Sequence, residues 1–371
     1  MEYKVRFVNY PKQYQNMKPE LDGAITEILS RGDFILRGQL KEFEQNMADF
    51  LGVKYTIGVN NGTDAIFLSL LAAGIGPGDE VITPAHTFVA TIAGIVHCGA
   101  TPLLVDIGED MNMNVGQVEQ LITPKTKAVL PVHLNGRLCD MGKLMKIADK
   151  HDLIIIEDAA QSLGGTYAGK MAGSIGLGGC FSFYPAKILG TAGDAGLVST
   201  NDKKFAEKIF SLRDNGRMMG SDEIDGFGYN TRLDNLHAAI LNVKFKYLPE
   251  WIKRRRVLAQ RYQEGLSDIS DLKLPPPPDA KEPFFDVFQN YVIRSKKRDK
   301  LAAHLRNQGV EIIISWLVPL NKQTKLGLEH FHLPMTEKIS NEVISLPLYP
   351  ELEDEKVEYV IDVLHDFYAN K

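Results

Sequence analysis

The feature that most constrains the fold of this chain is the alternation of two kinds of segment between residues 54 and 200. Short apolar runs, typical of buried strands, are separated by longer runs whose apolar residues recur at helical spacing. Strands that alternate with helices form a largely parallel sheet, with helices on both faces. The strands are predicted at residues 55–59, 80–83, 102–106, 128–132, 153–157, 180–184 and 196–200. The predicted fold class is therefore α/β, with a seven-stranded, largely parallel sheet.

The length of the chain indicates a second, smaller domain. With 371 residues, the chain exceeds the size at which a single hydrophobic core stops growing. A helical pattern is interrupted at Pro249, and the remainder has two short strand patterns at 287–294 and 310–314 with helical patterns at 298–309 and 356–368. We predict a large α/β domain at residues 1–248 and a smaller C-terminal α+β domain at residues 249–371.

Charge and hydropathy exclude two classes of partner. The net charge of −5 gives no reason to expect nucleic-acid binding, and the basic run at residues 253–256 is typical of a solvated helix face. The most apolar long segment, residues 87–105, is interrupted by His97, Gly99 and Pro102, so it predicts a helix, a turn and a strand instead of a membrane span.

The cysteines and the N-terminus favour a cytoplasmic protein. Cys98, Cys139 and Cys180 are far apart and form no CxxC pair, so neither a metal site nor a disulfide framework is predicted. The first six residues include charges where a signal peptide would need an apolar run. A reducing cytosol is the expected location.

Lys187 follows a predicted buried strand. Pro185 cannot donate a hydrogen bond to a sheet, so it ends the strand at residues 180–184. A lysine just beyond such a strand is partly stripped of water, which lowers its pKa and favours the neutral, nucleophilic amine that a Schiff base requires. The alternative is a solvated surface charge, as most lysines are.

Asp158 emerges at the end of another predicted strand, after four apolar residues and Glu157. A buried carboxylate there requires a cation or several hydrogen-bond donors, and a protonated ring nitrogen is one such cation. An aspartate that caps the next turn is an equally good interpretation of this position alone.

Two further strand ends carry candidate ligand-binding residues. Gly62 and Thr63 begin a predicted helix, whose free N–H groups attract an anion such as phosphate, although Asn61 or Thr63 could simply be an N-cap. Phe88 begins the next helix and could stack on a planar ring, although it could also be a core residue. Together with Lys187 and Asp158, these are the groups that a protein must provide for pyridoxal phosphate.

The sequence also resembles the DegT/StrS family of sugar aminotransferases, which are pyridoxal-phosphate enzymes of fold type I, the aspartate aminotransferase type. The resemblance covers nearly the whole chain. The matching motifs are residues 34–38, 61–65, 76–84, 131–136, 157–161, 182–187, 228–234 and 345–350. So many matches in the same order are highly specific.

The resemblance implies roles around the cofactor ring. Lys187 is similar to the lysine that forms the Schiff base, and Asp158 to the partner of the pyridine nitrogen. Gln161 resembles the residue beside the ring hydroxyl, and Phe88 the residue stacked on the ring face. Lys187 and Asp158 are thus the implied catalytic residues.

The resemblance also implies a phosphate site that is shared between subunits. Gly62, Thr63 and Ser182 match phosphate contacts of the family. Asn230 matches the asparagine that reaches the phosphate from the neighbouring subunit. A homodimer with shared active sites follows.

The activity that the resemblance implies is transfer of an amino group from glutamate to a nucleotide-linked keto-sugar. Asn230, Thr231 and the Ala238–Leu241 segment resemble members that act at C3, and a 4-keto-sugar aminotransferase is the alternative. The dehydratase branch of the family has histidine in place of the lysine, so Lys187 argues against it. A catalytically silent regulatory protein would not need the intact set of site residues. Ala195 and the Ser-Trp-Leu run at 315–317 depart from the family pattern, which leaves the sugar open.

Overall fold

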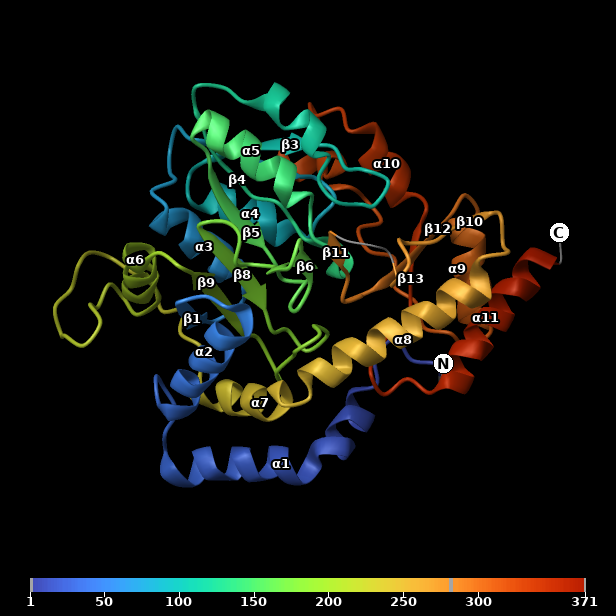
Figure 1. Ribbon diagram of the computed structural model, residues 1–371, viewed down its shortest axis with the longest axis horizontal. Coiled ribbons are helices and arrows are strands. Elements are labelled where there is room, and N and C mark those ends of the chain that lie inside the picture. The colour runs from blue at the N-terminus through green and yellow to red at the C-terminus, as the bar shows by residue number, and fades with distance from the viewer. Residues whose placement is uncertain (1–2, 280–282, 370–371) are drawn as a thin grey trace.

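The computed structural model describes residues 3–279 and 283–369, and a seven-stranded sheet lies at its centre (Figure 1). The strands are β1 (Tyr55–Val59), β2 (Glu80–Pro84), β3 (Thr101–Val105), β4 (Thr126–Val129), β5 (Ile154–Asp158), β8 (Gly178–Ser182) and β9 (Gly196–Thr200). Their order is β1-β9-β8-β5-β4-β2-β3. β9 is antiparallel to β1 and β8, whereas β2 with β3, β2 with β4, β4 with β5, and β5 with β8 are parallel. The predicted seven-stranded, largely parallel sheet is confirmed.

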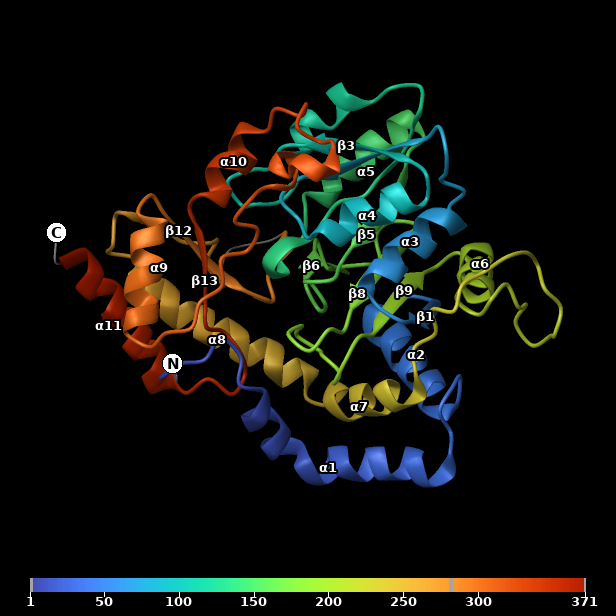
Figure 2. The same ribbon diagram turned by 180° about the vertical axis from the view of Figure 1, so that it is seen from behind.

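Helices cover both faces of this sheet. On one face, seen in front in Figure 2, lie α3 (Gly62–Ala72), α4 (Val89–His97) and α6 (Lys203–Arg213). On the other face lie α2 (Gly38–Leu51), α5 (Met141–His151) and α7 (Asn235–Phe245), with α1 (Tyr10–Arg31) packed against α7. Successive strand residues alternate between the two cores: Ile156 belongs to the same core as Phe205 of α6, and Ile155 to the same core as Leu144 of α5. Burial on both faces explains why the strands read as continuous apolar runs.

A second core surrounds a smaller antiparallel sheet. This sheet contains β10 (Leu272–Lys273), β12 (Tyr291–Ser295) and β13 (Val343–Leu346), and α8 (Leu248–Leu266), α9 (Arg298–Asn307) and α11 (Asp354–Ala369) pack around it. The first turns of α8 contribute Trp251 to the large core, whereas its last turns contribute Leu258 and Tyr262 to the second core. Val5 also belongs to the second core. The domain division between residues 248 and 249 stays a prediction.

Several predicted elements differ from the structure. The helix predicted at residues 115–121 is two short 3-10 turns, Val115–Gln117 and Glu119–Leu121. The strand predicted at 310–314 makes only isolated bridges, and the one predicted at 287–294 begins at Tyr291, because Phe288 has a left-handed φ of 51° that breaks extended backbone. The pattern did not indicate the short strands β6 (Thr166–Tyr167), β7 (Lys170–Met171), β10 and β11 (Phe284–Phe285) or the helix α10 (Pro334–Ser340).

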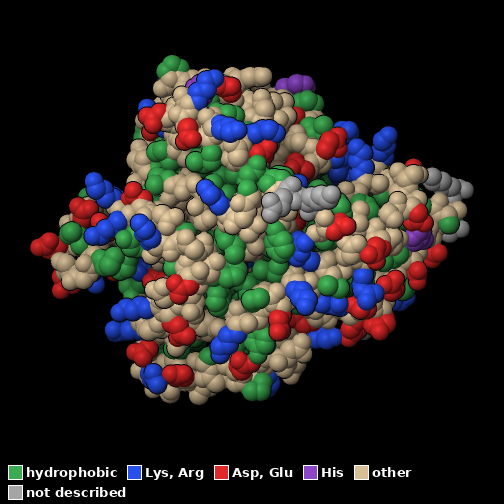
Figure 3. Space-filling model, in the orientation of Figure 1, with side chains coloured by type: hydrophobic (Ala, Val, Ile, Leu, Met, Phe, Trp, Pro, Cys, Tyr) green, Lys and Arg blue, Asp and Glu red, His purple; other side chains and the backbone are tan. Residues whose placement is uncertain are grey.

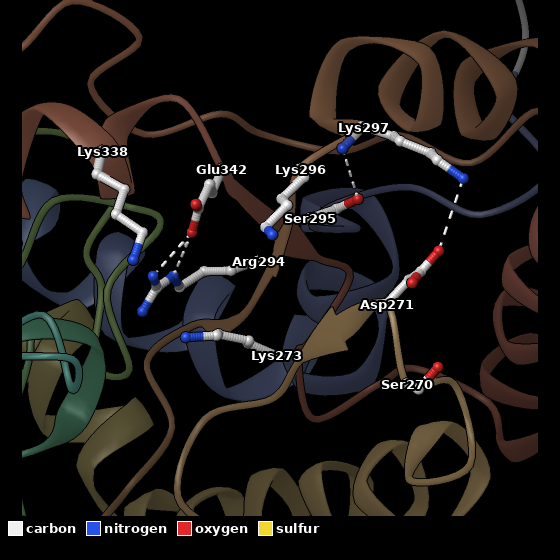
Figure 4. Close-up of a pocket in the computed structure, with 9 residues that line it drawn as sticks. All are labelled: Ser270, Asp271, Lys273, Arg294, Ser295, Lys296, Lys297, Lys338 and Glu342. Carbon is white, nitrogen blue, oxygen red and sulfur yellow. Dashed lines mark hydrogen bonds and ion pairs between the residues drawn. The ribbon is translucent and has the colours of Figure 1, made fainter.

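The loop after β3 fastens the central sheet to the second core. The buried carboxylate of Asp106 accepts hydrogen bonds from the backbone N–H groups of Met335 and Thr336 at the start of α10, at 2.9 and 2.7 Å. Glu109 then accepts a hydrogen bond from Arg294 at 2.5 Å. Arg294 lines a cavity of about 390 Å³, which is shown in Figure 4. Lys338 lies beside the same guanidinium in Figure 4 and is 3.9 Å from Glu109. These contacts hold the two sheets in a fixed relation.

No helix within residues 3–279 and 283–369 is long and apolar enough to cross a membrane. Across the same residues, no group of three or more His, Cys, Asp or Glu side chains could hold a metal ion. All three cysteines are buried and free. Of the six N-terminal residues considered above, Met1 and Glu2 lie outside the described residues.

Candidate active site

Lys187 lies in the loop that follows β8. A turn closed by a 2.8 Å hydrogen bond from Lys187 N–H to the Tyr184 carbonyl folds the chain back after the strand, and Thr191 N–H returns to the Phe183 carbonyl at 2.9 Å. The side chain of Lys187 is half-buried. Burial lowers the pKa of Lys187, and the nearby Asp158 carboxylate opposes that shift. This environment is the one that the strand-end position predicted.

Asp158 ends β5, the strand beside β8, and is buried. Its Oδ2 accepts a 2.8 Å hydrogen bond from the Thr91 hydroxyl, and its Oδ1 accepts from Ala160 N–H at 3.2 Å. Burial raises the pKa of Asp158, while both hydrogen bonds and the Lys187 ammonium oppose that shift. The bond to Ala160 is the local cap considered as an alternative, but it involves one oxygen only. A buried carboxylate with a raised pKa therefore lies close to the candidate Schiff-base lysine.

The candidate phosphate site lies where α3 begins beside the end of β8. Gly62 starts α3, and a Cβ atom at this position would lie 2.9 Å from the Cβ of Ser182. Asn61 is the N-cap, and its side chain accepts from Asp64 N–H at 2.8 Å. The N–H groups of Gly62 and Thr63 lie in the first turn of α3, where no preceding carbonyl of the helix can accept their hydrogen bonds. They therefore remain available to an anion. The structure thus brings Gly62, Thr63 and Ser182 together.

Gln161 and Phe88 lie at the same edge of the sheet. Gln161 follows β5, and its Oε1 accepts a 2.9 Å hydrogen bond from Asn135 N–H. Phe88 is the residue before α4 and is 60% exposed. The alternative of a core residue is therefore wrong for Phe88, and its ring is free to cover a planar ligand.

Asn230 stands apart from the other candidates in this single chain. Its backbone pairs with Asp214 at the base of the loop at residues 215–229, and its side chain is exposed. This loop projects beyond α6, away from the sheet (Figure 1). Among the described residues, no hydrogen bond or ion pair joins the Asn230 side chain to another candidate residue.

A buried network under Asp158 was not predicted from the sequence. Glu157 accepts hydrogen bonds from the N–H groups of Gly173 and Gly176 at 2.9 and 2.8 Å, and it lies 2.9 Å from His133 Nε2. Cys139 N–H donates to His133 Nδ1, so the ring proton is on Nε2 and points at Glu157. His133 N–H in turn donates to the Asp158 carbonyl at 2.9 Å. The network fixes the end of β5.

Replacing Thr91 with valine is expected to destabilise the cofactor-free protein by about 1–3 kcal/mol, because it removes a hydrogen bond to a buried carboxylate. The loss should be larger at pH 8 than at pH 5. The hydrogen bond from Thr91 lowers the pKa of Asp158, so its removal raises that pKa further above the value in the unfolded chain. Between these two pKa values the folded state binds more protons than the unfolded chain, and its stability therefore falls as the pH rises. Urea unfolding at the two pH values measures the difference.

Thr83→Val is the matched control for this variant. Thr83 is also buried, and its hydroxyl donates to a neutral acceptor, the Leu130 carbonyl, at 2.9 Å. Its loss of stability should be the same at both pH values. A pH-independent loss in Thr91→Val would show that Thr91 acts by packing alone.

The donor set of this site fits pyridoxal phosphate. The cofactor brings an aldehyde, a pyridine nitrogen, a planar ring and a phosphate. The site offers a lysine of lowered pKa, a buried carboxylate that lacks a full counter-charge, an exposed aromatic ring and a helix N-terminus with a close glycine approach.

Comparisons with known proteins agree with this interpretation. A sequence model of the DegT/DnrJ/EryC1/StrS aminotransferase family matches residues 15–365. A pleiotropic regulatory protein of Geobacillus stearothermophilus is 41% identical over 99% of both chains. A dTDP-3-amino-3,4,6-trideoxy-alpha-D-glucose transaminase of Streptomyces venezuelae is 37% identical over 98% of this chain and 96% of the relative. A UDP-N-acetyl-3-dehydro-alpha-D-glucosamine 3-aminotransferase of Acidithiobacillus ferrooxidans is 37% identical over 97% of each chain.

Solved structures extend the likeness to the fold. Streptomyces venezuelae DesV, in complex with a ketimine intermediate, is 37% identical and has a TM-score of 0.94 over 99% of both chains. Bacillus subtilis NtdA with bound cofactor PMP is 31% identical, with a TM-score of 0.89 over 97% of this chain and 83% of that chain. The aspartate aminotransferase type of fold expected from the sequence is confirmed by these matches.

Proposed function

The chain belongs to the DegT/DnrJ/EryC1/StrS aminotransferase family, and from this premise we propose that it transfers the amino group of glutamate to C3 of a nucleotide-linked keto-sugar. The observation that carries the proposal is the pairing of Lys187, whose pKa burial lowers, with the buried Asp158 at neighbouring strand ends. An aminotransferase needs one group that gains and loses a proton and one that holds a fixed charge.

Pyridoxal phosphate is the cofactor, and when bound it supplies the electron sink for this chemistry. In the proposal, Lys187 anchors it, Asp158 holds the proton on the ring nitrogen, and Gln161 lies beside the ring hydroxyl. Phe88 covers one ring face. Gly62, Thr63 and Ser182 bind the phosphate, with Asn230 of a neighbouring subunit. The contacts described above and the family resemblance support these roles.

Proton transfer falls to Lys187. Its Nζ takes a proton from the α-carbon of the donor amino acid and returns one to the sugar carbon that receives the amine. A lowered pKa makes the neutral amine accessible near neutral pH, so one side chain can act as base and then as acid. Asp158 remains ionised beside a cation, since an opposite charge offsets the cost of its burial.

The names of two relatives support C3 as the position of amination, since one names a 3-amino sugar and the other a 3-dehydro sugar. The test is to incubate the protein with glutamate and a panel of nucleotide-linked 3-keto- and 4-keto-sugars, and to identify the products by mass spectrometry and NMR. We expect a 3-amino product. Exclusive formation of a 4-amino product would refute this assignment and support the alternative of a 4-keto-sugar aminotransferase.

A regulatory role is the second candidate, because one relative is called a pleiotropic regulatory protein. The two functions differ in their response to glutamate. A transaminase shows the absorbance of a lysine-bound cofactor, and glutamate removes it. A silent protein of the same fold would keep its spectrum.

The buried, free cysteines support placing either activity in the reducing cytoplasm.

A homodimer with shared sites is part of the proposal. The projecting loop at residues 215–229 exposes large apolar side chains, and Figure 3 shows hydrophobic groups among the charges on this projection. These side chains are Met218, Met219, Ile224, Phe227 and Tyr229, with Phe227 fully exposed. Such a cluster is typical of a surface that another chain covers.

Mixing inactive Lys187→Ala and Asn230→Ala chains is expected to restore about one quarter of the wild-type activity. Half of randomly exchanged dimers are hybrids, and each hybrid has one site that combines an intact Lys187 with an intact Asn230. Native mass spectrometry confirms that hybrids have formed, and the rate of amination is then measured. No recovery in proven hybrids would mean that each site is built within one subunit.

A further inference from the structure

A short strap of chain from the second core crosses the loop that contains Lys187. This strap, residues 287–290, precedes β12. Gln289 is its central side chain and is only 7% exposed. Nothing in the strand or helix pattern singles out this residue, because its importance lies in contacts with a segment about one hundred residues earlier.

Gln289 binds the backbone on both sides of Lys187. Its Oε1 accepts a 2.8 Å hydrogen bond from Ile188 N–H, and its Nε2 donates a 2.8 Å hydrogen bond to the Ala186 carbonyl. A carboxamide presents one acceptor and one donor in a planar fork, so it can satisfy both groups at once. The peptide groups that flank Lys187 are therefore held by one side chain that is not part of their own loop.

The strap itself is fastened at several points. Val287 N–H donates to the Gly136 carbonyl at 3.0 Å, and the buried Arg255 donates to the Gln289 carbonyl at 3.2 Å. Gly136 has a φ of 97°, and a Cβ atom at this position would lie 2.7 Å from the backbone nitrogen of Gln289. Only glycine accommodates this backbone conformation and this close approach.

The same turn connects the strap to Gln161. Asn135, next to Gly136, donates its N–H to Gln161 Oε1 at 2.9 Å, and its Oδ1 accepts from the Asn290 side chain at 3.1 Å. One continuous set of hydrogen bonds thus joins the candidate residue beside the ring hydroxyl, the turn at residues 134–136, the strap and the backbone of Lys187.

We propose that Gln289 is a positioning residue that fixes the backbone of Lys187, and hence the direction from which Lys187 Nζ approaches the reacting atoms. The inference rests on the proposed role of Lys187. Without Gln289, the Ala186 carbonyl and the Ile188 N–H lose their partner, so the segment at residues 186–188 gains freedom. A displacement of about 1 Å at a reacting group costs on the order of 100-fold in rate.

Two substitutions distinguish the contributions of the two hydrogen bonds made by the Gln289 carboxamide. Gln289→Met keeps the length and apolar volume of the side chain but removes both hydrogen bonds. Gln289→Glu keeps an acceptor for Ile188 N–H and adds a negative charge, which would raise the pKa of Lys187. The matched control is Asn242→Leu. Asn242 is 6% exposed and its amide donates to the Gln39 carbonyl at 2.9 Å, on helices that are outside the Lys187 loop.

The first measurement is hydrogen-deuterium exchange of residues 186–190 in the cofactor-free protein. We expect the Ile188 amide to exchange at least about tenfold faster in Gln289→Met, since its hydrogen bond is lost, and to remain protected in Gln289→Glu and Asn242→Leu. Unchanged protection in Gln289→Met, or an equal loss of protection in Asn242→Leu, would overturn the inference.

The second measurement is the pH profile of turnover with cofactor bound. Gln289→Met should lower kcat about 10- to 100-fold with little change in the KM for the sugar, and Gln289→Glu should move the basic limb of the profile to higher pH. A wild-type kcat in Gln289→Met would contradict the inference. If the wild-type cofactor were attached to a lysine other than Lys187, the proposed function would fail, whereas the exchange result would still decide whether Gln289 holds this loop.

Discussion

Replacing Lys187 with alanine is expected to lower turnover by at least about 10⁴-fold, the upper range for a general acid-base group, because the variant lacks the amine that is proposed to attach the cofactor and move the proton. The fold should remain intact. Burial lowers the pKa of Lys187, so the wild-type folded state binds fewer protons than the unfolded chain between that lowered pKa and 10.5. Wild-type stability should therefore rise as pH increases through this interval, and this contribution should disappear in the alanine variant.

Peptide mapping after borohydride reduction of the wild type checks the assignment of Lys187. The reduced cofactor should be found on the peptide that contains Lys187. Lys170→Ala is the control, since Lys170 is exposed on the β6–β7 hairpin and its loss should change neither labelling nor turnover. A label on another lysine, or normal turnover in Lys187→Ala, would sink the assignment.

Replacing Asp158 with asparagine is expected to lower kcat by about 10²–10³-fold while cofactor is retained, because a neutral amide cannot keep a proton on the ring nitrogen. The variant should also be more stable than the wild type in its cofactor-free form above the raised pKa of Asp158. In the cofactor-free form the buried negative charge of Asp158 destabilises the folded state, as the raised pKa of this carboxyl indicates. Asparagine removes that charge.

Opposite changes in rate and stability distinguish this role from a structural cap. If Asp158 only capped the turn through Ala160, the asparagine variant would have wild-type kinetics. Steady-state rates and urea unfolding of the same preparations measure both quantities. Wild-type turnover in Asp158→Asn would refute the proposed contact with the ring nitrogen.

Much of the fold could be predicted because continuous apolar runs indicate strands that are buried on both faces of the sheet. The bounds of β1 and β9 were predicted to the residue, and those of the other central strands to within a few residues. The direction of β9 was not predictable, since a strand buried on both faces has the same composition whether it runs parallel or antiparallel. Residues 115–121 have helical spacing, but the pattern does not distinguish an α-helix from two 3-10 turns.

The candidate site was partly predictable because the carboxyl ends of parallel strands meet at one edge of a sheet. That rule places Asp158 beside Lys187, and the structure agrees. Thr91 and Gln289 could not be found in this way, because each acts through one contact with a distant segment and neither lies in a distinctive pattern. The proposed role of Asn230 requires a second copy of the chain, so it stays a prediction.

The second core combines the two ends of the described chain. Val5 packs in the same cluster as Val357, Val360 and Leu364 of α11, although more than three hundred residues separate them in sequence. Synthesis proceeds from the N-terminal to the C-terminal side of this chain, so the cluster around Val5 cannot form until α11 has been made. The central sheet has all of its strands by residue 200 and can form earlier. Val5 therefore lacks its packing partners in α11 until that helix has been synthesised, and the second core is completed after the strands of the central sheet have been made.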